Sequence, residues 1–304
     1  MTRHFCFWGL RIDSDLELPE LPTACGNPPG PPEVRIERVG PARLREPRPP
    51  ATLGYLGFRV PGVATYEVIE GREIRVGPLA GASPGTVRLF LLGSAWAGLC
   101  YQRGLYPLHA GVSRFGAGAV AFCGPPGTGK STLAAALAAN GCQPVSDDLC
   151  RLDFDQEGCP QVWPGAARHK LHPESVELAL PFTEATEDEA GSGKLLLPWS
   201  QAPPTKPVPL AALVLLDWHE AFPELQRATG AEGLRELVAG ATYRGGFVDE
   251  MGLVAEHWKA LAQAARRAPI YRLLRPRGAF YLDWTRSLLL RTFGGVRAGA
   301  TTPR

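Results

Sequence analysis

The chain has 304 residues, of which 45% are hydrophobic and 20% charged, with a formal net charge of +2. These values predict one large or two ordinary globular domains and exclude global disorder. They also exclude a strongly basic surface of the kind that holds a nucleic-acid backbone, so we expect no nucleic-acid partner. The most apolar stretch, 87–101, contains Arg88 and is too short to span a bilayer, so no membrane segment is predicted.

The cysteines and the N-terminus indicate where the protein resides. The seven cysteines form an odd set without a CxxC pair, and no pair of histidines has zinc-ligand spacing. The first residues mix polar and apolar types instead of forming the apolar core of a signal peptide. We therefore expect a cytoplasmic protein with reduced thiols.

Residues 1–84 predict a small β-rich N-terminal domain. Short β-prone segments are separated by turn residues, by a Pro-rich connector at 18–32 and by an Arg/Pro-rich loop at 41–50. The expected strands are 5–12, 33–39, 55–60, 65–69 and 73–76.

Residues 85–304 predict a second, α/β domain. A helix at 86–103 is followed by strands that alternate with helices, which favours an α/β core. The expected strands are 108–115, 119–123, 144–152, 161–163, 210–218 and 270–274. The expected helices are 131–140, 173–180, 232–241, 251–267 and 282–293, with an acidic loop at 184–193 and a frayed tail after 294.

One motif in this domain carries a specific chemistry. The segment Gly124-Pro125-Pro126-Gly127-Thr128-Gly129-Lys130-Ser131 matches the P-loop pattern GxxxxGK[ST] between a predicted strand and a predicted helix. The glycines let the backbone point its N–H groups at an anion, and the helix N-terminus adds a positive dipole end. We expect this segment, with Thr132, to bind ATP. The alternative is a glycine-rich turn with an ordinary surface lysine.

Two residues of the P-loop and two carboxylates after it have expected roles. Lys130 is expected to reach the β- and γ-phosphates, and Ser131 to hold Mg²⁺. Asp147 and Asp148 follow at the end of the next predicted strand, where one could ligate Mg²⁺ while the other accepts a proton from a hydroxyl. A solvated turn is the alternative for this acidic pair.

Three spaced elements resemble a known family. The run Leu108-His109-Ala110-Gly111-Val112, the P-loop and Val145-Ser146-Asp147-Asp148 are similar to the catalytic domain of HPr kinase/phosphorylase over residues 105–153. The resemblance implies an α/β P-loop kinase core of HPr-kinase type. It implies that Asp147 is the general base and that Asp148 and Ser131 serve Mg²⁺, with the two Asp roles open to exchange. It places His109 beside the phosphates or against an Asp; the residue alone favours a strand histidine bonded to backbone.

Softer motifs refine the resemblance. The segment 163–171 departs from the glycine-rich, Glu-containing motif of HPr kinases. The whole chain is more similar to the shorter HPr-kinase-related proteins of lasso-peptide biosynthesis, through 7–10, 18–22, 241–249 and 269–273 with Arg275-Pro276-Arg277. That resemblance implies phosphorylation of a hydroxyl on a peptide or protein substrate, a lasso-peptide precursor. The resemblance to HPr kinase makes a homo-oligomer an expectation.

Four basic residues are candidates for stabilising transition-state charge. Arg168 and Lys170 follow the predicted hairpin near the Asp pair, Lys194 lies after the acidic loop, and Arg244 precedes two glycines. Surface solvation is the alternative for each. Two other functions stay open at this point: a kinase for a small molecule such as free serine, and a non-catalytic ATP-sensing module.

Overall fold

The computed structural model describes residues 2–22, 31–45, 50–179, 185–187, 193–220 and 222–295. The chain divides into two compact units. The first is Met1–Tyr106 with Asp188–Ser192 and Arg244–Ala255, and the second is Pro107–Glu187 with Gly193–Tyr243 and Glu256–Arg304. The division falls after Tyr106, later than the expected boundary at 84/85, because the helix that follows the first sheet packs on that sheet.

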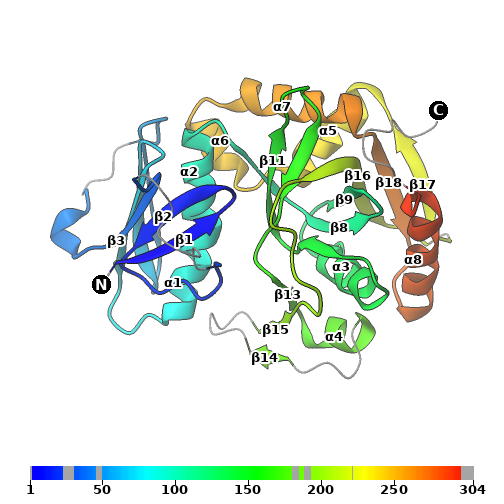
Figure 1. The fold of residues 1–304 in the computed structure, drawn as a ribbon, viewed down its shortest axis with the longest axis horizontal. Coiled ribbons are helices and arrows are strands. Elements are labelled where there is room, and N and C mark those ends of the chain that lie inside the picture. Colours follow the sequence, from blue (N-terminus) through cyan, green and yellow to red (C-terminus); the bar gives the residue numbers. More distant parts are fainter. Residues whose placement is uncertain are drawn as a thin grey trace. The chain divides into compact units, whose positions relative to one another are not determined.

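The first unit is built on a six-stranded sheet with the order β1-β2-β3-β6-β5-β4 (Figure 1). The β2–β3 and β3–β6 pairs are parallel and the others antiparallel. The strands are β1 (Arg3–Phe7), β2 (Leu10–Ser14), β3 (Val34–Arg38), β4 (Tyr55–Val60), β5 (Ala64–Ile69) and β6 (Glu73–Pro78), with a 3₁₀ turn η1 (Pro41–Arg43). The single strand expected at 5–12 is wrong, because positive φ angles at Trp8 (51°) and Gly9 (75°) turn the chain into the β1–β2 hairpin.

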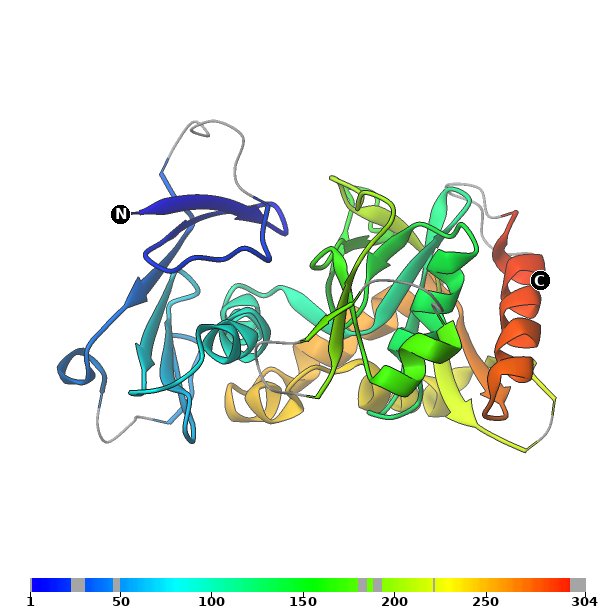
Figure 2. The same ribbon diagram turned by 90° about the horizontal axis from the view of Figure 1, so that it is seen from below.

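A nearly continuous helix covers one face of this sheet (Figure 2). It consists of α1 (Pro84–Phe90), a π-helical turn η2 (Leu91–Ala95) and α2 (Trp96–Gln102), close to the predicted 86–103. Gly98 lets it approach closely, since a Cβ there would lie 2.3 Å from Leu56 Cδ2. The short helix α6 (Gly245–Glu250), which was not predicted, belongs to the same unit, and its Phe247 ring lies 5.5 Å from that of Phe58.

The second unit is built on a sheet with the order β10-β8-β9-β16-β12-β11-β7, with β18 beside β16 and β17 beside β18. Its strands are β7 (Tyr106–His109), β8 (Gly111–Phe115), β9 (Gly118–Cys123), β10 (Pro144–Ser146), β11 (Leu149–Phe154), β12 (Pro160–Trp163), β16 (Val208–Trp218), β17 (Glu224–Ala228) and β18 (Ile270–Arg275). The strands β9, β16 and β18 are parallel, so their carboxyl ends meet at one edge of the sheet.

Helices cover both faces of this second sheet, which confirms the expected α/β class (Figure 1). On one face, α3 (Lys130–Ala139) and α8 (Ala279–Phe293) share a buried core with alternate residues of β9 and β16, including Phe122, Leu133 and Phe293. On the other face, α5 (Gly230–Ala241) packs through Gly240 against Leu215. The helix α7 (Val254–Arg267) starts three residues after the predicted 251.

A small second layer adjoins α3. The helix α4 (Pro173–Ala179) and the strand β13 (Arg168–Leu171) both contact α3. The strand β13 pairs with β15 (Leu195–Pro198), which pairs with β14 (Thr186–Glu187). The expected loop at 184–193 therefore contains a short strand. Most other residues of that loop, and all residues of the predicted tail after 294 except Gly295, lie outside the described residues.

Two predicted strands are each broken in the structure, and both breaks lie near the P-loop. The expected strand 108–115 is divided at Ala110, whose N–H donates to the carbonyl of Asp148 at 3.1 Å. The expected strand 144–152 is divided at Asp147 and Asp148 into β10 and β11. The break brings the end of β7, and with it His109, beside the acidic pair.

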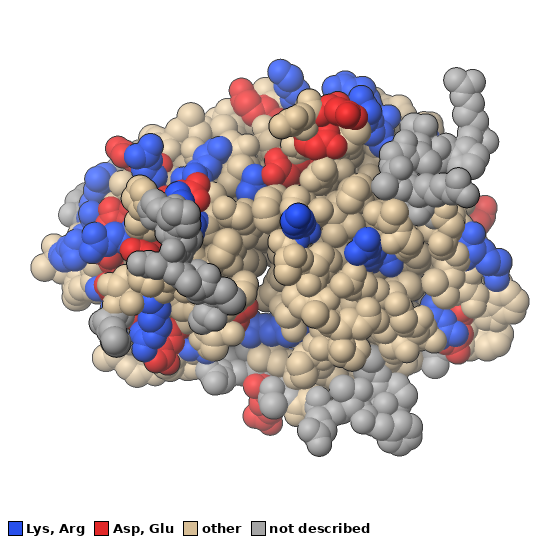
Figure 3. Space-filling view, viewed as in Figure 1, with Lys and Arg blue, Asp and Glu red and all other residues tan. Residues whose placement is uncertain are grey.

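The distribution of charged side chains agrees with the net charge of +2. On the face shown in Figure 3, basic and acidic side chains are interspersed. Within the residues that the structure describes, every helix is too short or too polar to cross a bilayer.

Candidate active site

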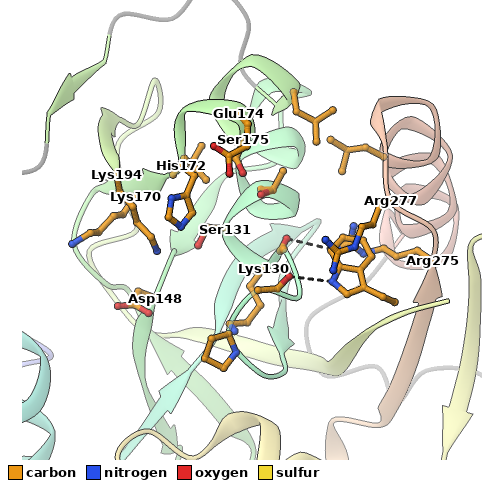
Figure 4. A pocket seen from close by; sticks show the side chains of 18 of the residues that line it. Lys130, Ser131, Asp148, Lys170, His172, Glu174, Ser175, Lys194, Arg275 and Arg277 are labelled. Carbon is orange, nitrogen blue, oxygen red and sulfur yellow. Dashed lines mark hydrogen bonds between the residues drawn. The ribbon is translucent and has the colours of Figure 1, made fainter. Parts of the chain in front are cut away.

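The P-loop lies at the edge where β9, β16 and β18 end, beside a cavity of about 530 Å³ (Figure 4). The carboxyl edge of parallel strands is where ligands bind in open α/β sheets, and ligand pockets span roughly 300–1,000 Å³. The cavity is lined by the P-loop and the start of α3, by the ends of β7, β16 and β18, and by residues on β13 and α4.

The P-loop backbone has the shape of an anion cradle. Gly124, Gly127 and Gly129 have φ angles of 141°, 82° and 78°, which residues other than glycine rarely adopt. The Nζ atom of Lys130 donates to the carbonyls of Gly124 and Pro125 at 2.7 and 3.1 Å. Burial lowers the pKa of Lys130, and the charge of Asp148 opposes this shift. Here the buried ammonium has only neutral carbonyls as hydrogen-bond acceptors, so an anion in the cradle would be a stronger partner.

Two side chains from neighbouring strand ends hold the P-loop carbonyls. The parallel register pairs Trp218 of β16 with Arg275 of β18. The Nε1 atom of Trp218 donates to the carbonyl of Gly127 at 3.1 Å, and Nη2 of Arg275 donates to that of Thr128 at 2.7 Å. Both contacts fix P-loop carbonyls from outside the loop. Two N–H groups of the loop are also engaged, since that of Gly124 donates to the carbonyl of Gly240 at 3.0 Å and that of Thr128 to the carbonyl of Pro125 at 3.4 Å.

Two guanidinium groups lie over the indole ring of Trp218. The guanidinium carbons of Arg275 and Arg277 lie 4.3 and 4.8 Å from the centroid of Trp218. Arg275 is only 4% exposed, and burial lowers its pKa to about 10, so it stays charged at neutral pH. In the sequence, the Arg275–Arg277 segment contributes only to a family resemblance, and nothing places Trp218 in the site. The P-loop motif does not predict which distant strands end beside it.

Asp148 is the acidic member of the pair that faces the cavity. Its carboxylate lines the pocket with Lys130 and Ser131, and its Oδ1 lies 3.3 Å from Nε2 of His109. Desolvation alone would raise the pKa of Asp148, but the hydrogen bond and charge of His109, followed by the charges of Lys194 and Lys130, outweigh it and lower the pKa. Asp148 is therefore an ionised acceptor at neutral pH.

Asp147 lies elsewhere. It is only 5% exposed and is not among the described residues that line the cavity. Its Oδ2 accepts the N–H of Lys170 at 2.9 Å, and its Oδ1 lies 3.3 Å from Nδ1 of His169, which is itself buried. The residue implied as the general base thus anchors β13, while the residue implied as a Mg²⁺ ligand lines the cavity beside the P-loop.

The other predicted residues fall into two groups. His109, Lys170, Lys194 and Thr132 line the same cavity as the P-loop. Arg168 begins β13 and is absent from the described lining, and Arg244 belongs to the first unit, where its Nε donates to Ser94 Oγ at 3.0 Å. The structure thus brings together most of the predicted phosphate-binding set without Arg168.

Comparisons with known proteins give one distant likeness. No family model matches the sequence, and no curated protein matches it. One of the similar solved structures is described as the Hpr(Ser) kinase/phosphatase from Coxiella burnetii; it has a TM-score of 0.33 and 12% identity, and the alignment covers 61% of this chain and 94% of that one. At this TM-score and identity the likeness carries no functional conclusion.

The residues fit a nucleotide-bound Mg²⁺ better than an isolated metal centre. No group of three or more His, Cys, Asp and Glu side chains suited to a metal occurs in the described part of the chain. Magnesium in nucleotide sites takes one or two protein oxygens and completes its shell with phosphate and water. Ser131 and Asp148 line one pocket beside the cradle and offer such oxygens.

Proposed function

We propose that the protein is an ATP-dependent kinase that transfers the γ-phosphoryl group to a hydroxyl of a peptide or protein. The observation that carries this proposal is the carboxylate of Asp148, 3.3 Å from Nε2 of His109, in one cavity with Lys130 and Ser131 of the P-loop. A P-loop alone binds nucleotide; a carboxylate held beside the phosphate end adds an acceptor for the hydroxyl proton.

In this proposal the chain's own groups divide the work. The P-loop N–H groups and Lys130 bind the phosphates, and Ser131 holds Mg²⁺, which when bound neutralises charge on the phosphate oxygens. Asp148 accepts the proton of the attacking hydroxyl, so the O–H bond breaks as oxygen bonds to phosphorus and ADP leaves. His109 orients Asp148. Lys170 and Lys194 line the same cavity and supply positive charge near the transferred group.

The finer identity of the substrate follows from the sequence resemblance given above. We propose a lasso-peptide precursor as the class of peptide acceptor, with a cytoplasmic location and a homo-oligomeric assembly as further parts of the proposal. A peptide hydroxyl and a free amino acid make the same chemical demand on Asp148, so only competition between the two identifies the acceptor.

The test uses the full chain with Mg-ATP and two acceptor sets: a library of synthetic Ser- and Thr-containing peptides, and free L-serine. We expect ADP release and a mass gain of one phosphate on a peptide hydroxyl, with loss of nucleotide binding in Lys130→Ala. Nucleotide binding without transfer to any acceptor would support the sensing module instead. Transfer to free serine that peptides do not inhibit would support the small-molecule kinase.

Asp148 has two candidate roles that one further measurement separates. If Asp148 accepts the proton, Asp148→Asn stays inactive at every Mg²⁺ concentration. If its main role is to hold the metal, raising Mg²⁺ restores much of the activity of Asp148→Asn.

A further inference from the structure

The cavity has a second end that the transfer chemistry above does not use. Trp218, Arg275, Arg277, Gly278 and Leu282 line this end. In the view of Figure 4, Arg275 and Arg277 lie on the other side of Lys130 from Asp148, Lys170 and Lys194. If the γ-phosphate end of a nucleotide lies beside Asp148, the nucleoside must extend away from Asp148. Two parts of the lining are then open to it, this end and the side formed by α4, and of the two only this end places planar cationic groups over an indole.

Two residues at this end, Arg275 and Arg277, carry planar cationic groups that differ in exposure. Arg275 is buried and fixed by its bond to the carbonyl of Thr128, whereas Arg277 is exposed. Both lie over the indole of Trp218. A planar guanidinium supported by an aromatic ring is a surface on which another flat π-system can stack.

We propose that this end is the nucleobase subsite, and that Arg277, supported by Trp218, holds a purine by stacking. The inference rests on the proposed nucleotide-binding function and adds the mode of base recognition. Arg275 is the fixed part of the platform because its Nη2 is engaged by the P-loop, and Arg277 is the part that contacts the ligand. A stacked base gains affinity from its π-face, which every purine has.

The same residues offer no acceptor to the 6-amino group of adenine. The indole N–H of Trp218 is used by Gly127, and Gly278 and Leu282 have no polar side-chain atoms. Arginine has only donors, which suit the O6 and N7 acceptors of guanine. Among the described side chains at this end, none can therefore select adenine, and ATP is not expected to bind more tightly than GTP.

The experiment measures Kd by calorimetry for ATP, GTP and inorganic tripolyphosphate, each with Mg²⁺. It compares the wild type, Arg277→Ala, Arg277→Lys and the control Arg291→Ala, which removes an exposed arginine from the last turn of α8. Arg277→Lys keeps the positive charge but loses the planar guanidinium group. We expect the ratio of the ATP Kd to the tripolyphosphate Kd to rise about tenfold in both Arg277 variants, which is the size of one base stack, and to stay unchanged in the control.

The outcomes separate this inference from the function on which it rests. A ratio that stays constant in both Arg277 variants would overturn the stacking role, because Arg277 would then contact phosphate or nothing. A wild-type preference above tenfold for ATP over GTP would overturn recognition by these side chains. A folded wild type that binds none of the three ligands would refute the proposed nucleotide-binding function, before any variant is compared.

Discussion

Asp147 and Asp148 are neighbours in the chain, yet their carboxylates have separate partners within the second unit. Asp147 accepts the backbone N–H of Lys170 at 2.9 Å, whereas Asp148 lies 3.3 Å from Nε2 of His109 at the cavity wall. The chain bends at Asp147 and Asp148 between β10 and β11, and this bend directs the carboxylate of Asp147 to β13 and that of Asp148 to the pocket. The two residues are therefore expected to respond differently to substitution.

Asp148→Asn is expected to remove phosphoryl transfer while it preserves nucleotide binding. An amide cannot accept the hydroxyl proton, and loss of a general base costs roughly 10²- to 10⁴-fold in rate. The P-loop contacts of Lys130 do not involve Asp148. Single-turnover transfer from labelled ATP, with a parallel ATP titration, checks both parts. A transfer rate within a few-fold of the wild type would remove Asp148 from the reaction.

Asp147→Ala is expected to destabilise the second unit. It would leave the N–H of Lys170 without its acceptor and Nδ1 of His169 without its neighbour, in surroundings where both aspartate and histidine are nearly fully buried. Unsatisfied buried polar groups of this kind cost about 1–3 kcal/mol. Denaturant unfolding measures the loss. Asp147→Asn, which keeps an acceptor oxygen, should recover part of it, and equal stability of all three proteins would contradict the anchoring role.

Gly129→Ala and Gly127→Ala form a matched pair that tests the contact between Arg275 and the P-loop. Both glycines have a φ near 80°, so both substitutions carry the same cost of roughly 1–2 kcal/mol for a left-handed residue. A Cβ at Gly129 would also lie 2.8 Å from Nη2 of Arg275, whereas a Cβ at Gly127 would meet nothing within 4 Å. Titration with ATP should therefore show a much larger rise in Kd for Gly129→Ala. Equal losses would mean that Arg275 moves aside freely.

The sequence was sufficient for the parts of the site that are local. The P-loop with its flanking strand and helix depends on residues close together in the chain. The placement of His109 against an Asp came from the family resemblance, because the residue alone favours a strand histidine bonded to backbone. The α/β class follows from the alternation of strands and helices. The helix 86–103 was found because the apolar stretch 87–101 is too short to span a bilayer and is typical of a buried helix.

The parts that failed depend on contacts between distant segments. Trp218 and Arg275 meet the P-loop only because β16 and β18 pair in parallel with one particular register. The roles of Asp147 and Asp148 depend on where β13 and β7 lie, and β13 is a short strand without a clear periodic pattern. The break at Trp8 and Gly9 was missed because an apolar residue with positive φ does not resemble a turn former.

The pH dependence of transfer offers a test of the pair formed by His109 and Asp148. The pKa of Asp148 is lowered, so its carboxylate is ionised throughout the neutral range. The stability that this carboxylate contributes is present above its unfolded-state pKa and is lost as the pH falls through the lower folded value. In His109→Gln the positive charge that imidazole can carry is gone, so the pKa of Asp148 rises.

The acid limb of kcat/KM should then move to higher pH in His109→Gln, because kcat/KM reports the free enzyme. Lys259→Gln, on α7, serves as a control that changes a positive charge at a residue outside the described pocket lining. Identical acid limbs in the wild type and His109→Gln would show that Asp148 is not the group that limits the rate at low pH.

The buried histidine of α7 is expected to make the stability of the second unit depend on pH. His257 is 2% exposed, its Nε2 lies 2.9 Å from Oγ1 of Thr242, and burial lowers its pKa to about 4. The unfolded chain, with a histidine pKa near 6.5, binds more protons than the folded chain between about pH 4 and 6.5, so stability rises with pH across this window. Lowering the pH from 7 to 5 should cost about 2 kcal/mol through this residue.

Urea unfolding at pH 7 and pH 5 measures this loss as the change in the free energy of unfolding. In His257→Gln, which cannot gain a proton, the loss between the two pH values should shrink by about 2 kcal/mol. Lys259→Gln, at an exposed position on the same helix, is the control and should leave the pH dependence as in the wild type. If His257→Gln and the wild type lose the same free energy, the folded protein takes up a proton at His257 without opening, and the helix packing around it is looser than the structure shows.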